Sequence, residues 1–387
     1  MCCKISHFFL TGQRVKYKFN AIADMTEDKS VLVGMSGGID STAVCSMLLE
    51  QGYRVEGLTF VTCDAGLRAA DEAAALAARL GIPHHIADVR EEFRKLVIEP
   101  FIDAYLRGST PNPCVNCNPT MKFRLLEEWA DKLGCRNIAT GHYVKIKESN
   151  SNGEKRYFIV TGDDDRKDQS YFLWRLTQQQ LSRVIFPLGG WEKHDVIAYL
   201  KGRGLQSAAD SGESMEVCFI PGDYRDFLRA NVPDIDARLG GGAFVDSAGR
   251  TLGQHSGYPF YTVGQRKGLG IALGYPAYVL KTNPAKNTVM LGREEQLQTR
   301  YMLIEAPQWI DGVPEGISVR VRYRSSPVMC DAPVAVDESR WLVRLHDTVQ
   351  AITPGQSAVF YQGNTVVGGA FIADQRGINQ WIPKENE

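Results

Sequence analysis

The chain has 387 residues, of which 44% are hydrophobic and 23% are charged, a composition ordinary for globular proteins. Its 44 basic and 45 acidic residues nearly cancel, so a nucleic-acid partner would have to meet local basic patches rather than a basic chain. No apolar run reaches the roughly 20 residues that a membrane span needs, so the sequence predicts no membrane-spanning helix. The length allows two or three domains, each with its own core.

Residues 1–25 form a leader whose apolar run is too short for a signal peptide. Because Met25 shortly precedes the first predicted strand, we expect these residues to be dispensable. Nine cysteines without a signal peptide are typical of reduced thiols. The sequence therefore predicts a cytoplasmic protein, which we expect to be a monomer.

The first predicted strand, at Val31–Val33, leads into a glycine-rich turn and then a helix. The turn and the start of the helix consist of Gly34, Met35, Ser36, Gly37, Gly38, Ile39, Asp40 and Ser41. Glycines let the backbone approach a ligand, and a helix N-terminus favours anions. No Lys-Ser or Lys-Thr closes the turn, so it is not a P-loop. The pattern Ser-Gly-Gly-x-Asp-Ser resembles the loop of enzymes that split ATP into AMP and pyrophosphate; the plain alternative is an ordinary glycine turn.

Strands and helices alternate through the first half of the chain. Strands are predicted at 53–60, 84–89 and 136–140, and helices at 69–80, 91–106 (with a kink at Pro100) and 122–133. This alternation predicts right-handed βαβ units and a parallel sheet, hence an α/β fold. Ligands of such sheets lie beyond the carboxyl ends of the strands, where the glycine-rich turn is expected.

The second half of the chain differs in glycine content and in its pattern of apolar residues. Glycines cluster from about residue 207, and short alternating runs at 317–323, 340–345 and 357–361 predict strands of a small β-barrel or sandwich. We therefore expect a nucleotide-binding domain over 26–206, a small central domain over 207–288, and a C-terminal β-barrel over 289–387.

Two cysteines, Cys114 and Cys117, share a Cys-x-x-Cys spacing in a proline-rich loop. This spacing lets both sulfurs face one point, which suits a metal, an iron–sulfur cluster or a redox pair. A second Cys-x-x-Cys is missing from the sequence, and Cys218 is the candidate partner. Cys45 is expected to be a core thiol, and packing roles are expected for Cys63 and Cys135.

Several ordered motifs resemble those of the tRNA-specific 2-thiouridylases. They are Ser36–Ser41, Thr110–Pro113 with Cys117 and Asn118, 141–143, 167–173, 218–220, 261–271, 320–323 and 353–361. The resemblance runs in order from about residue 30 to 375. It implies a PP-loop ATPase domain with the parallel sheet of the adenine nucleotide alpha-hydrolases, then a small central domain and a C-terminal antiparallel β-barrel. It also implies a tRNA sulfurtransferase that uses ATP to 2-thiolate the wobble uridine of the tRNAs for Lys, Glu and Gln.

The resemblance further implies the roles of individual residues. ATP, with Mg²⁺ neutralising its charge, would contact the residues from Gly34 to Ser41 together with Phe60 and Gly141. The target base would contact Asn112, Pro113 and Cys114, and the rest of the tRNA would contact His142, Lys167, Asp168, Gln169, Arg322, Tyr323 and Gln356. Cys117 would be the catalytic thiol and Cys218 the persulfide carrier, and the two would close a disulfide as sulfide is released. The sulfur would come from a cysteine desulfurase or relay protein, or from free sulfide.

Two alternatives remain open at the level of sequence. Some family members carry Asp at the position of Cys114, and here Cys114, Cys117 and Cys218 could instead hold three corners of a [4Fe–4S] cluster that binds sulfide. For the whole protein, the competing hypotheses are an AMP-forming amide ligase or amidotransferase, and an RNA-binding thiol or iron–sulfur redox sensor without turnover.

Overall fold

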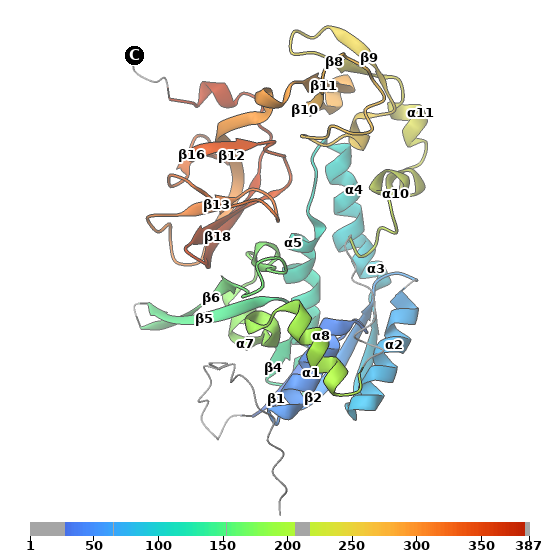
Figure 1. Ribbon diagram of the computed structural model, residues 1–387, viewed down its shortest axis with the longest axis vertical. Coiled ribbons are helices and arrows are strands. Elements are labelled where there is room, and N and C mark those ends of the chain that lie inside the picture. Colours follow the sequence, from blue (N-terminus) through green and yellow to red (C-terminus); the bar gives the residue numbers. More distant parts are fainter. Residues whose placement is uncertain (1–27, 65, 152, 206–216, 384–387) are drawn as a thin grey trace, which may run out of the picture.

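The computed structural model describes residues 28–64, 66–151, 153–205 and 217–383. The leader 1–25 and the predicted boundary at 206–207 lie outside these ranges. The described chain forms an elongated molecule with a parallel-sheet unit at one end, a small mixed unit at the other, and an antiparallel sheet beside them (Figure 1).

The first unit contains a five-stranded parallel sheet. Its strands are β1 (Ser30–Gly34), β2 (Arg54–Val61), β3 (His84–Asp88), β4 (Asn137–Ala139) and β7 (Val184–Ile185), in the order β3-β2-β1-β4-β7. Every neighbouring pair is parallel. The predicted α/β fold is therefore confirmed.

Helices cover both faces of this sheet because the residues of β1 alternate between two cores. Val31 and Val33 pack with α1 (Ile39–Glu50), α2 (Gly66–Leu80) and α8 (Lys193–Gly202). Leu32 faces the other way, into the core that includes α6 (Arg124–Leu133). Side chains of a strand alternate between its faces, so a fully apolar strand needs cover on both.

The helical segments that carry the cysteine loop contain two π-helical turns. α3 (Arg90–Phe93), the π-helix η1 (Arg94–Ile98) and α4 (Glu99–Leu106) follow one another, and α5 (Pro113–Cys117), the π-helix η2 (Asn118–Phe123) and α6 form a second series. The kink predicted at Pro100 takes the form of the π-turn just before it. Proline has no N–H to donate, and a wider turn accommodates that loss.

A β-hairpin from the first half of the chain joins the C-terminal sheet. β5 (Val144–Ser151) and β6 (Glu154–Thr161) pair with each other, and Val160 pairs with Thr365 of β18. The 3-10 helix η3 (Ser170–Phe172), α7 (Gln178–Arg183) and the 3-10 helix η4 (Pro187–Gly190) connect this hairpin to β7 and α8. The hairpin thus ties the two units together.

The central unit is a four-stranded mixed sheet with two short helices. α10 (Tyr224–Asn231) and α11 (Ile235–Leu239) precede β8 (Gly242–Val245), β9 (Thr251–His255), β10 (Tyr278–Asn283) and β11 (Thr288–Gly292). The strand order is β10-β11-β8-β9. The 3-10 turns η5 (Tyr258–Phe260), η6 (Pro284–Lys286) and η7 (Glu294–Leu297) complete it.

The C-terminal sheet is antiparallel throughout and curls toward a barrel. Its strands are β12 (Gln298–Trp309), β13 (Ser318–Arg320), β14 (Val328–Met329), β15 (Val334–Ala335), β16 (Arg340–Gln350), β17 (Ser357–Gln362) and β18 (Thr365–Ile372), followed by the 3-10 turn η8 (Ile378–Gln380). The order is β14-β13-β17-β18-β12-β16-β15. A bridge between Cys330 and Leu345 brings the β14 end back to β16, which confirms the predicted barrel-like architecture.

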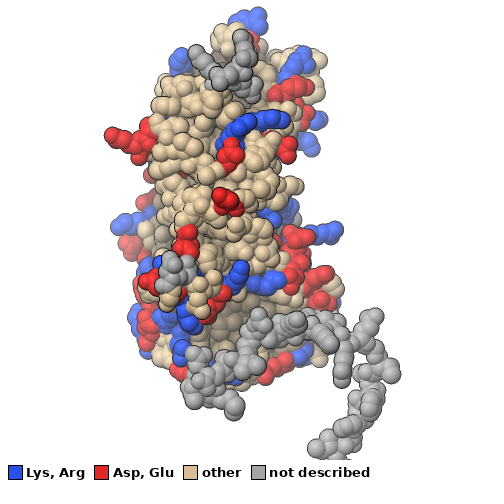
Figure 2. Space-filling model, turned by 90° about the vertical axis from the view of Figure 1, so that its left-hand side faces the viewer, with Lys and Arg blue, Asp and Glu red and all other residues tan. Residues whose placement is uncertain are grey.

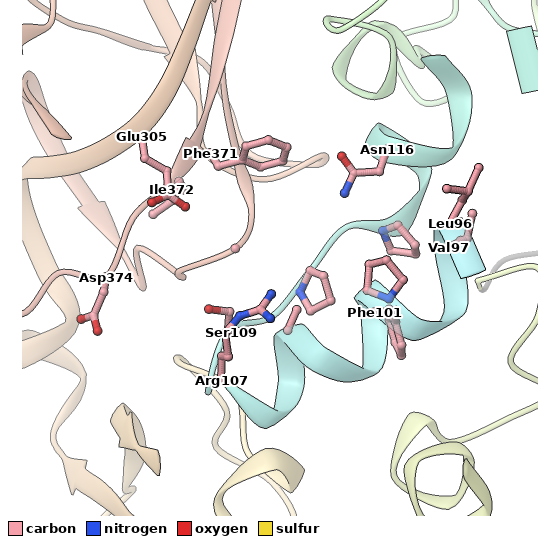
Figure 3. A pocket seen from close by; sticks show the side chains of 15 residues that line it. Leu96, Val97, Phe101, Arg107, Ser109, Asn116, Glu305, Phe371, Ile372 and Asp374 are labelled. Carbon is pink, nitrogen blue, oxygen red and sulfur yellow. The ribbon is translucent and has the colours of Figure 1, made fainter. Parts of the chain in front are cut away.

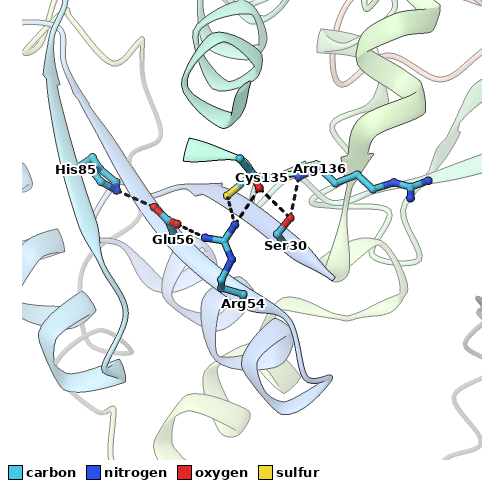
Figure 4. Close-up of polar contacts among 7 residues, drawn as sticks. Ser30, Arg54, Glu56, His85, Cys135 and Arg136 are labelled. Atoms are coloured by element: carbon cyan, nitrogen blue, oxygen red, sulfur yellow. Dashed lines mark hydrogen bonds and ion pairs between the residues drawn. The ribbon is translucent and has the colours of Figure 1, made fainter. Parts of the chain in front are cut away.

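A polar network fastens the amino ends of the parallel strands (Figure 4). Glu56, which is buried, pairs with Arg54 and with Nε2 of His85 at 2.9 Å. Arg54 also donates to the carbonyl of Gly134 at 2.9 Å, and the backbone N–H of Arg136 donates to Oγ of Ser30 at 2.9 Å. The network lies at the edge of the sheet opposite the glycine-rich turn, where it joins the amino ends of neighbouring strands.

The surface carries charge of both signs. Lys and Arg alternate with Asp and Glu over the face in Figure 2, with broad uncharged areas between them. This distribution agrees with the balanced composition. In the described ranges, no helix is long and apolar enough to span a bilayer.

Candidate active site

The glycine-rich turn between β1 and α1 is held by its own hydroxyl groups. The N–H of Ser36 donates to Oγ of Ser41 at 3.2 Å, and Oγ1 of Thr42 donates to the carbonyl of Gly38 at 2.9 Å. Gly37 has φ +75°, and a Cβ there would lie 3.0 Å from the carbonyl oxygen of Ala69. The turn therefore requires glycine at this position, and its shape is fixed before any ligand binds.

Helices α1 and α8 lie side by side and run in the same direction. Three pairs of contacts share a sequence offset of 153 residues: Lys193 with Asp40, Tyr199 with Ser46, and Arg203 with Glu50. Both N-termini thus reach the carboxyl edge of the sheet, as the two helices in Figure 1 show. The positive ends of two helix dipoles at one edge favour an anion there.

Asp40, in the first turn of α1, collects the polar contacts of the turn. Its Oδ1 accepts from Oη of Tyr143 and from Nζ of Lys193, each at 2.7 Å. The Lys193 side chain is only 12% exposed. At Gly141, a Cβ would lie 2.8 Å from Cβ of Asp40, so glycine lets the chain after β4 pass this residue.

Tyr143 and Lys193 were not among the predicted site residues. Both are more than 100 positions from Asp40 in sequence. One signal could have indicated Lys193: a cation in the first turn of a helix opposes the helix dipole and calls for an anionic partner.

A cavity of about 710 Å³ opens beside Asp40 and connects the parallel-sheet unit with the C-terminal sheet. The predicted residues that line it are Ser36, Gly38, Ile39, Asp40, Asn112, Pro113, Cys114, Lys167, Gln169, Tyr323 and Gln356. Lining residues that were not predicted are Pro111, Tyr143, Arg166, Phe172, Lys193, Val217 and Arg324. One cavity therefore joins the residues predicted for ATP, for the base and for tRNA.

The C-terminal sheet fixes one wall of this cavity. The N–H of Thr110 donates to the carbonyl of Pro354 at 2.8 Å, and Nε2 of Gln356 donates to the carbonyl of Thr110 at 2.7 Å. The ring of Tyr323 lies 4.4 Å from that of Phe172, centroid to centroid. The two hydrogen bonds hold the proline-rich loop, and the aromatic pair offers a surface on which a base can stack.

Several predicted site residues lie outside the cavity lining. Gly34 ends β1, Met35 is buried beneath the turn, Gly37 and Gly141 shape the backbone, and Phe60 on β2 packs against the core. Asp168 is buried and binds Arg320 at 2.9 Å and Oγ of Ser170 at 2.9 Å. Arg322 donates to the carbonyl of Gln350 at 3.2 Å, whereas its neighbour Arg324 lines the cavity.

His142 lies in the core beneath the site. Its Nδ1 is 2.7 Å from Oγ1 of Thr140, and its ring packs against those of Phe123 and Phe186, which also contact each other. Burial, helped by the nearby Lys122, holds its pKa well below 6.5. His142 is therefore neutral at physiological pH, and its predicted contact with tRNA remains a prediction.

The three predicted sulfur residues lie next to the cavity. Cys114 and Cys117 are half-buried on α5, and Cys218 is exposed and follows Val217 of the cavity lining. Desolvation by the surrounding protein raises the pKa of all three thiols, that of Cys218 to about 11 even though its side chain reaches solvent, while the positive charge of Lys122 lowers each. The thiols are close enough to influence one another electrostatically.

The other cysteines divide into core and site neighbours. Cys45, Cys135 and Cys330 are buried, as expected for the first two. Cys63 was predicted to pack in the core; it is half-buried and interacts electrostatically with Cys218. All seven cysteines in the described ranges are free, so the structure does not support the predicted disulfide between Cys117 and Cys218. Within the same ranges, no three His, Cys, Asp or Glu side chains are grouped to hold a metal ion.

A second cavity of about 260 Å³ lies behind the proline-rich loop (Figure 3). Pro111 and Pro113 line both cavities. Phe101 on α4 and Phe371 on the C-terminal sheet supply apolar walls, and Arg107 also lines the cavity. The proline-rich loop thus separates the two cavities.

Models of three protein families match successive parts of the chain. They are described as the tRNA methyl transferase HUP domain (residues 29–222), the tRNA methyl transferase PRC-barrel domain (225–293) and the aminomethyltransferase beta-barrel domain (299–372). These matches define a HUP-domain protein with two appended β modules, in agreement with the fold.

Relatives that match over nearly their whole length define the class more closely. The chain is 54% identical over 374 residues to tRNA-specific 2-thiouridylase MnmA 3 of Phocaeicola vulgatus, covering 93% of this chain and 98% of that one. It is 55% identical to MnmA 3 of Bacteroides fragilis with the same coverage, and 43% identical to MnmA of Cytophaga hutchinsonii, covering 90% and 98%. The chain belongs to the tRNA-specific 2-thiouridylase MnmA family.

Proposed function

We propose that this protein is a tRNA sulfurtransferase that uses ATP to 2-thiolate the wobble uridine of the tRNAs for Lys, Glu and Gln. One observation carries the proposal: Asp40 of the glycine-rich turn, Cys114 of the thiol loop and Tyr323 of the C-terminal sheet line the same cavity. An enzyme that activates a nucleotide base and then gives it sulfur needs these three functions around one reacting atom.

The glycine-rich turn supports the activation step. The uracil O2 attacks the α-phosphorus of ATP, pyrophosphate leaves, and O2 becomes linked to AMP. The turn, the two helix N-termini and Lys193 offer N–H groups and positive charge to the departing pyrophosphate. Asp40 is the carboxylate of the lining that would hold Mg²⁺, because hard oxygen ligands suit this ion, and bound Mg²⁺ would neutralise phosphate charge.

The thiols support the sulfur step. The terminal sulfur of a Cys218 persulfide attacks C2 of the activated base and AMP leaves. The Cys117 thiolate then attacks the remaining Cys218 sulfur; the S–S bond to the transferred sulfur breaks, which leaves 2-thiouridine and a Cys117–Cys218 disulfide. A thiol reductant restores the two cysteines. The persulfide itself comes from a cysteine desulfurase or a relay protein.

A [4Fe–4S] cluster on Cys114, Cys117 and Cys218 is the second candidate for the sulfur step, with free sulfide as the donor. The position of the three cysteines beside one cavity is the observation in its favour, whereas no three side chains of the described ranges are grouped to hold a metal ion. Anaerobic purification followed by iron and sulfide analysis distinguishes the two: iron near four per chain that is lost in Cys114→Ala supports the cluster, and iron-free active protein supports the persulfide.

The decisive experiment measures 2-thiouridine directly. The protein is incubated with ATP, Mg²⁺, a sulfide or persulfide source and unmodified tRNA for Glu, and nucleosides are analysed by mass spectrometry. We expect 2-thiouridine that depends on ATP, with AMP and pyrophosphate formed in equal amounts. ATP turnover without thiouridine would instead favour an amide ligase, and binding without turnover would favour a redox sensor.

A further inference from the structure

The segment 163–169 contains an acidic run whose middle residue, Asp164, organises a turn. Its backbone carbonyl accepts from the N–H of Lys167 at 3.0 Å and from the N–H of Asp168 at 2.8 Å. Its Oδ1 accepts from the N–H of Arg166 at 3.0 Å. Asp164 thereby fixes the turn that carries Arg166, Lys167 and Gln169 into the lining of the main cavity.

The other oxygen of the same carboxylate reaches helix α8. Oδ2 of Asp164 accepts from the backbone N–H of Lys193 at 3.0 Å. Lys193 is the first residue of α8, where N–H groups lack acceptors within the helix. The N-cap residue, Glu192, makes no side-chain capping hydrogen bond, so Asp164 supplies a cap from a distant part of the chain.

Helix α8 and the Asp164 turn, which Asp164 joins, contact different parts of the molecule. The Lys193 side chain extends from the capped residue to Asp40 of the glycine-rich turn, at 2.7 Å. Asp168, at the other side of the Asp164 turn, is bound by Arg320 of the C-terminal sheet at 2.9 Å. The neighbours of Asp164 in the acidic run make no such bridge: Asp163 pairs with Lys145 at the surface, and Asp165 is exposed.

We infer that Asp164 is a positioning residue that sets the nucleotide-facing Lys193 and the tRNA-facing turn 166–169 at the same time. It lies outside the cavity lining and acts through its neighbours. The inference rests on the proposed function, since it assigns one face of the cavity to ATP and the other to tRNA. Its consequence is that one side chain controls the affinity of two different substrates.

The test compares Asp164→Ala with Asp165→Ala, which removes the same charge from the same run. Equilibrium dissociation constants are measured for ATP with Mg²⁺ by calorimetry and for unmodified tRNA for Glu by filter binding. We expect both constants to rise about tenfold in Asp164→Ala, the order of effect of a lost hydrogen bond to a charged group, and neither to change in Asp165→Ala. A loss of correctly folded protein would lower the binding stoichiometry and leave both constants unchanged, and this result would overturn the inference.

A double variant tests the route through Lys193. In a Lys193→Ala background, Asp164→Ala should no longer weaken ATP binding but should still weaken tRNA binding about tenfold. A further loss of ATP affinity in that background would overturn the inference. If Asp164→Ala does not fold, Asp164→Asn, which cannot accept from both N–H groups with its one oxygen, replaces it in the same measurements. Failure of the wild-type protein to bind or thiolate tRNA would contradict the proposed function instead.

Discussion

The nucleotide half and the thiol half of the cavity are built in different ways. The nucleotide half comes from one contiguous turn, locked by hydrogen bonds within it and by Lys193 and Tyr143 on Asp40. The thiol half is assembled from α5 and from Cys218, which lie about a hundred residues apart, and its sulfurs are free. The first half is preorganised for binding, whereas desolvation by the surrounding protein raises the pKa of the thiols in the second half and keeps them protonated, so a nucleophile has to be generated there during the reaction.

The largest expected effect is a loss of thiolation with no change in ATP affinity. Replacing Cys117 or Cys218 by Ser should lower the rate of 2-thiouridine formation by about 10³-fold or more, because the proposed covalent sulfur carrier or its proposed partner is lost. The dissociation constant of ATP should not change. Cys63→Ser is the matched control, since Cys63 also interacts electrostatically with Cys218 but has no proposed role in sulfur transfer, and it should retain thiolation.

Equal loss of ATP affinity in the Cys117 and Cys218 variants would contradict the division into halves. Equal loss of thiolation in Cys63→Ser would instead make Cys63 a fourth member of the thiol group. Mass spectrometry of nucleosides and calorimetric titration with ATP are the two measurements.

The next largest effect is expected at Lys193 in the nucleotide half. Lys193→Met should weaken ATP binding about 10- to 100-fold, because a charge-assisted contact to phosphate is worth about 1.5–3 kcal/mol. Alkylation of Cys218 by iodoacetamide should proceed at the wild-type rate. Lys201→Met, an exposed position in the last turn of the same helix, is the control and should leave both measurements unchanged. A wild-type ATP affinity in Lys193→Met would show that the turn binds phosphate without help from α8.

The nucleotide half and the thiol half of the cavity also differ in how far the sequence predicted them. The glycine-rich turn was predicted residue by residue because its determinants are contiguous: glycines, hydroxyls and an acid between a strand and a helix. Tyr143 and Lys193 were missed because they approach Asp40 only after the sheet forms. The three thiols were identified from spacing and resemblance, but their protonation depends on burial and on Lys122, which no local pattern shows.

The sequence also did not predict which polar residues are buried and which line the cavity. Asp168 lies in a segment that resembles a tRNA-binding motif, yet it is buried against Arg320. Arg322 and Arg324 are two positions apart, and only the fold of the turn after β13 decides that Arg324 faces the cavity. Parallel-sheet topology was predictable from the alternation of elements; the attachment of the β5–β6 hairpin to β18 was not, because strand pairing over 200 residues leaves no local trace.

A smaller effect is expected where the nucleotide half depends on close backbone packing. Gly141→Ala places a methyl group 2.8 Å from Cβ of Asp40, and overpacking of this kind costs about 1–3 kcal/mol. Urea denaturation should show the loss of stability, and ATP should bind more weakly because Asp40 moves. Gly202→Ala, at the end of α8 with open space around it, is the control and should leave the stability within about 1 kcal/mol of the wild type. Unchanged ATP affinity in a destabilised Gly141→Ala protein would show that Asp40 is not held as tightly as the contacts indicate.

The smallest effect concerns the core that supports both halves. The pKa of His142 is held well below 6.5 in the folded protein but returns to about 6.5 on unfolding, so the unfolded chain binds more protons below that pH. The contribution of His142 to stability is therefore complete above about pH 6.5 and is lost as the pH falls, by up to about 1.4 kcal/mol per pH unit. In His142→Gln, the free energy of unfolding from urea titrations should fall less between pH 6.5 and 5.5 than in the wild type. An identical slope in His142→Gln would mean that the imidazole is accessible to protons, and it would return His142 to the group of residues that can contact tRNA.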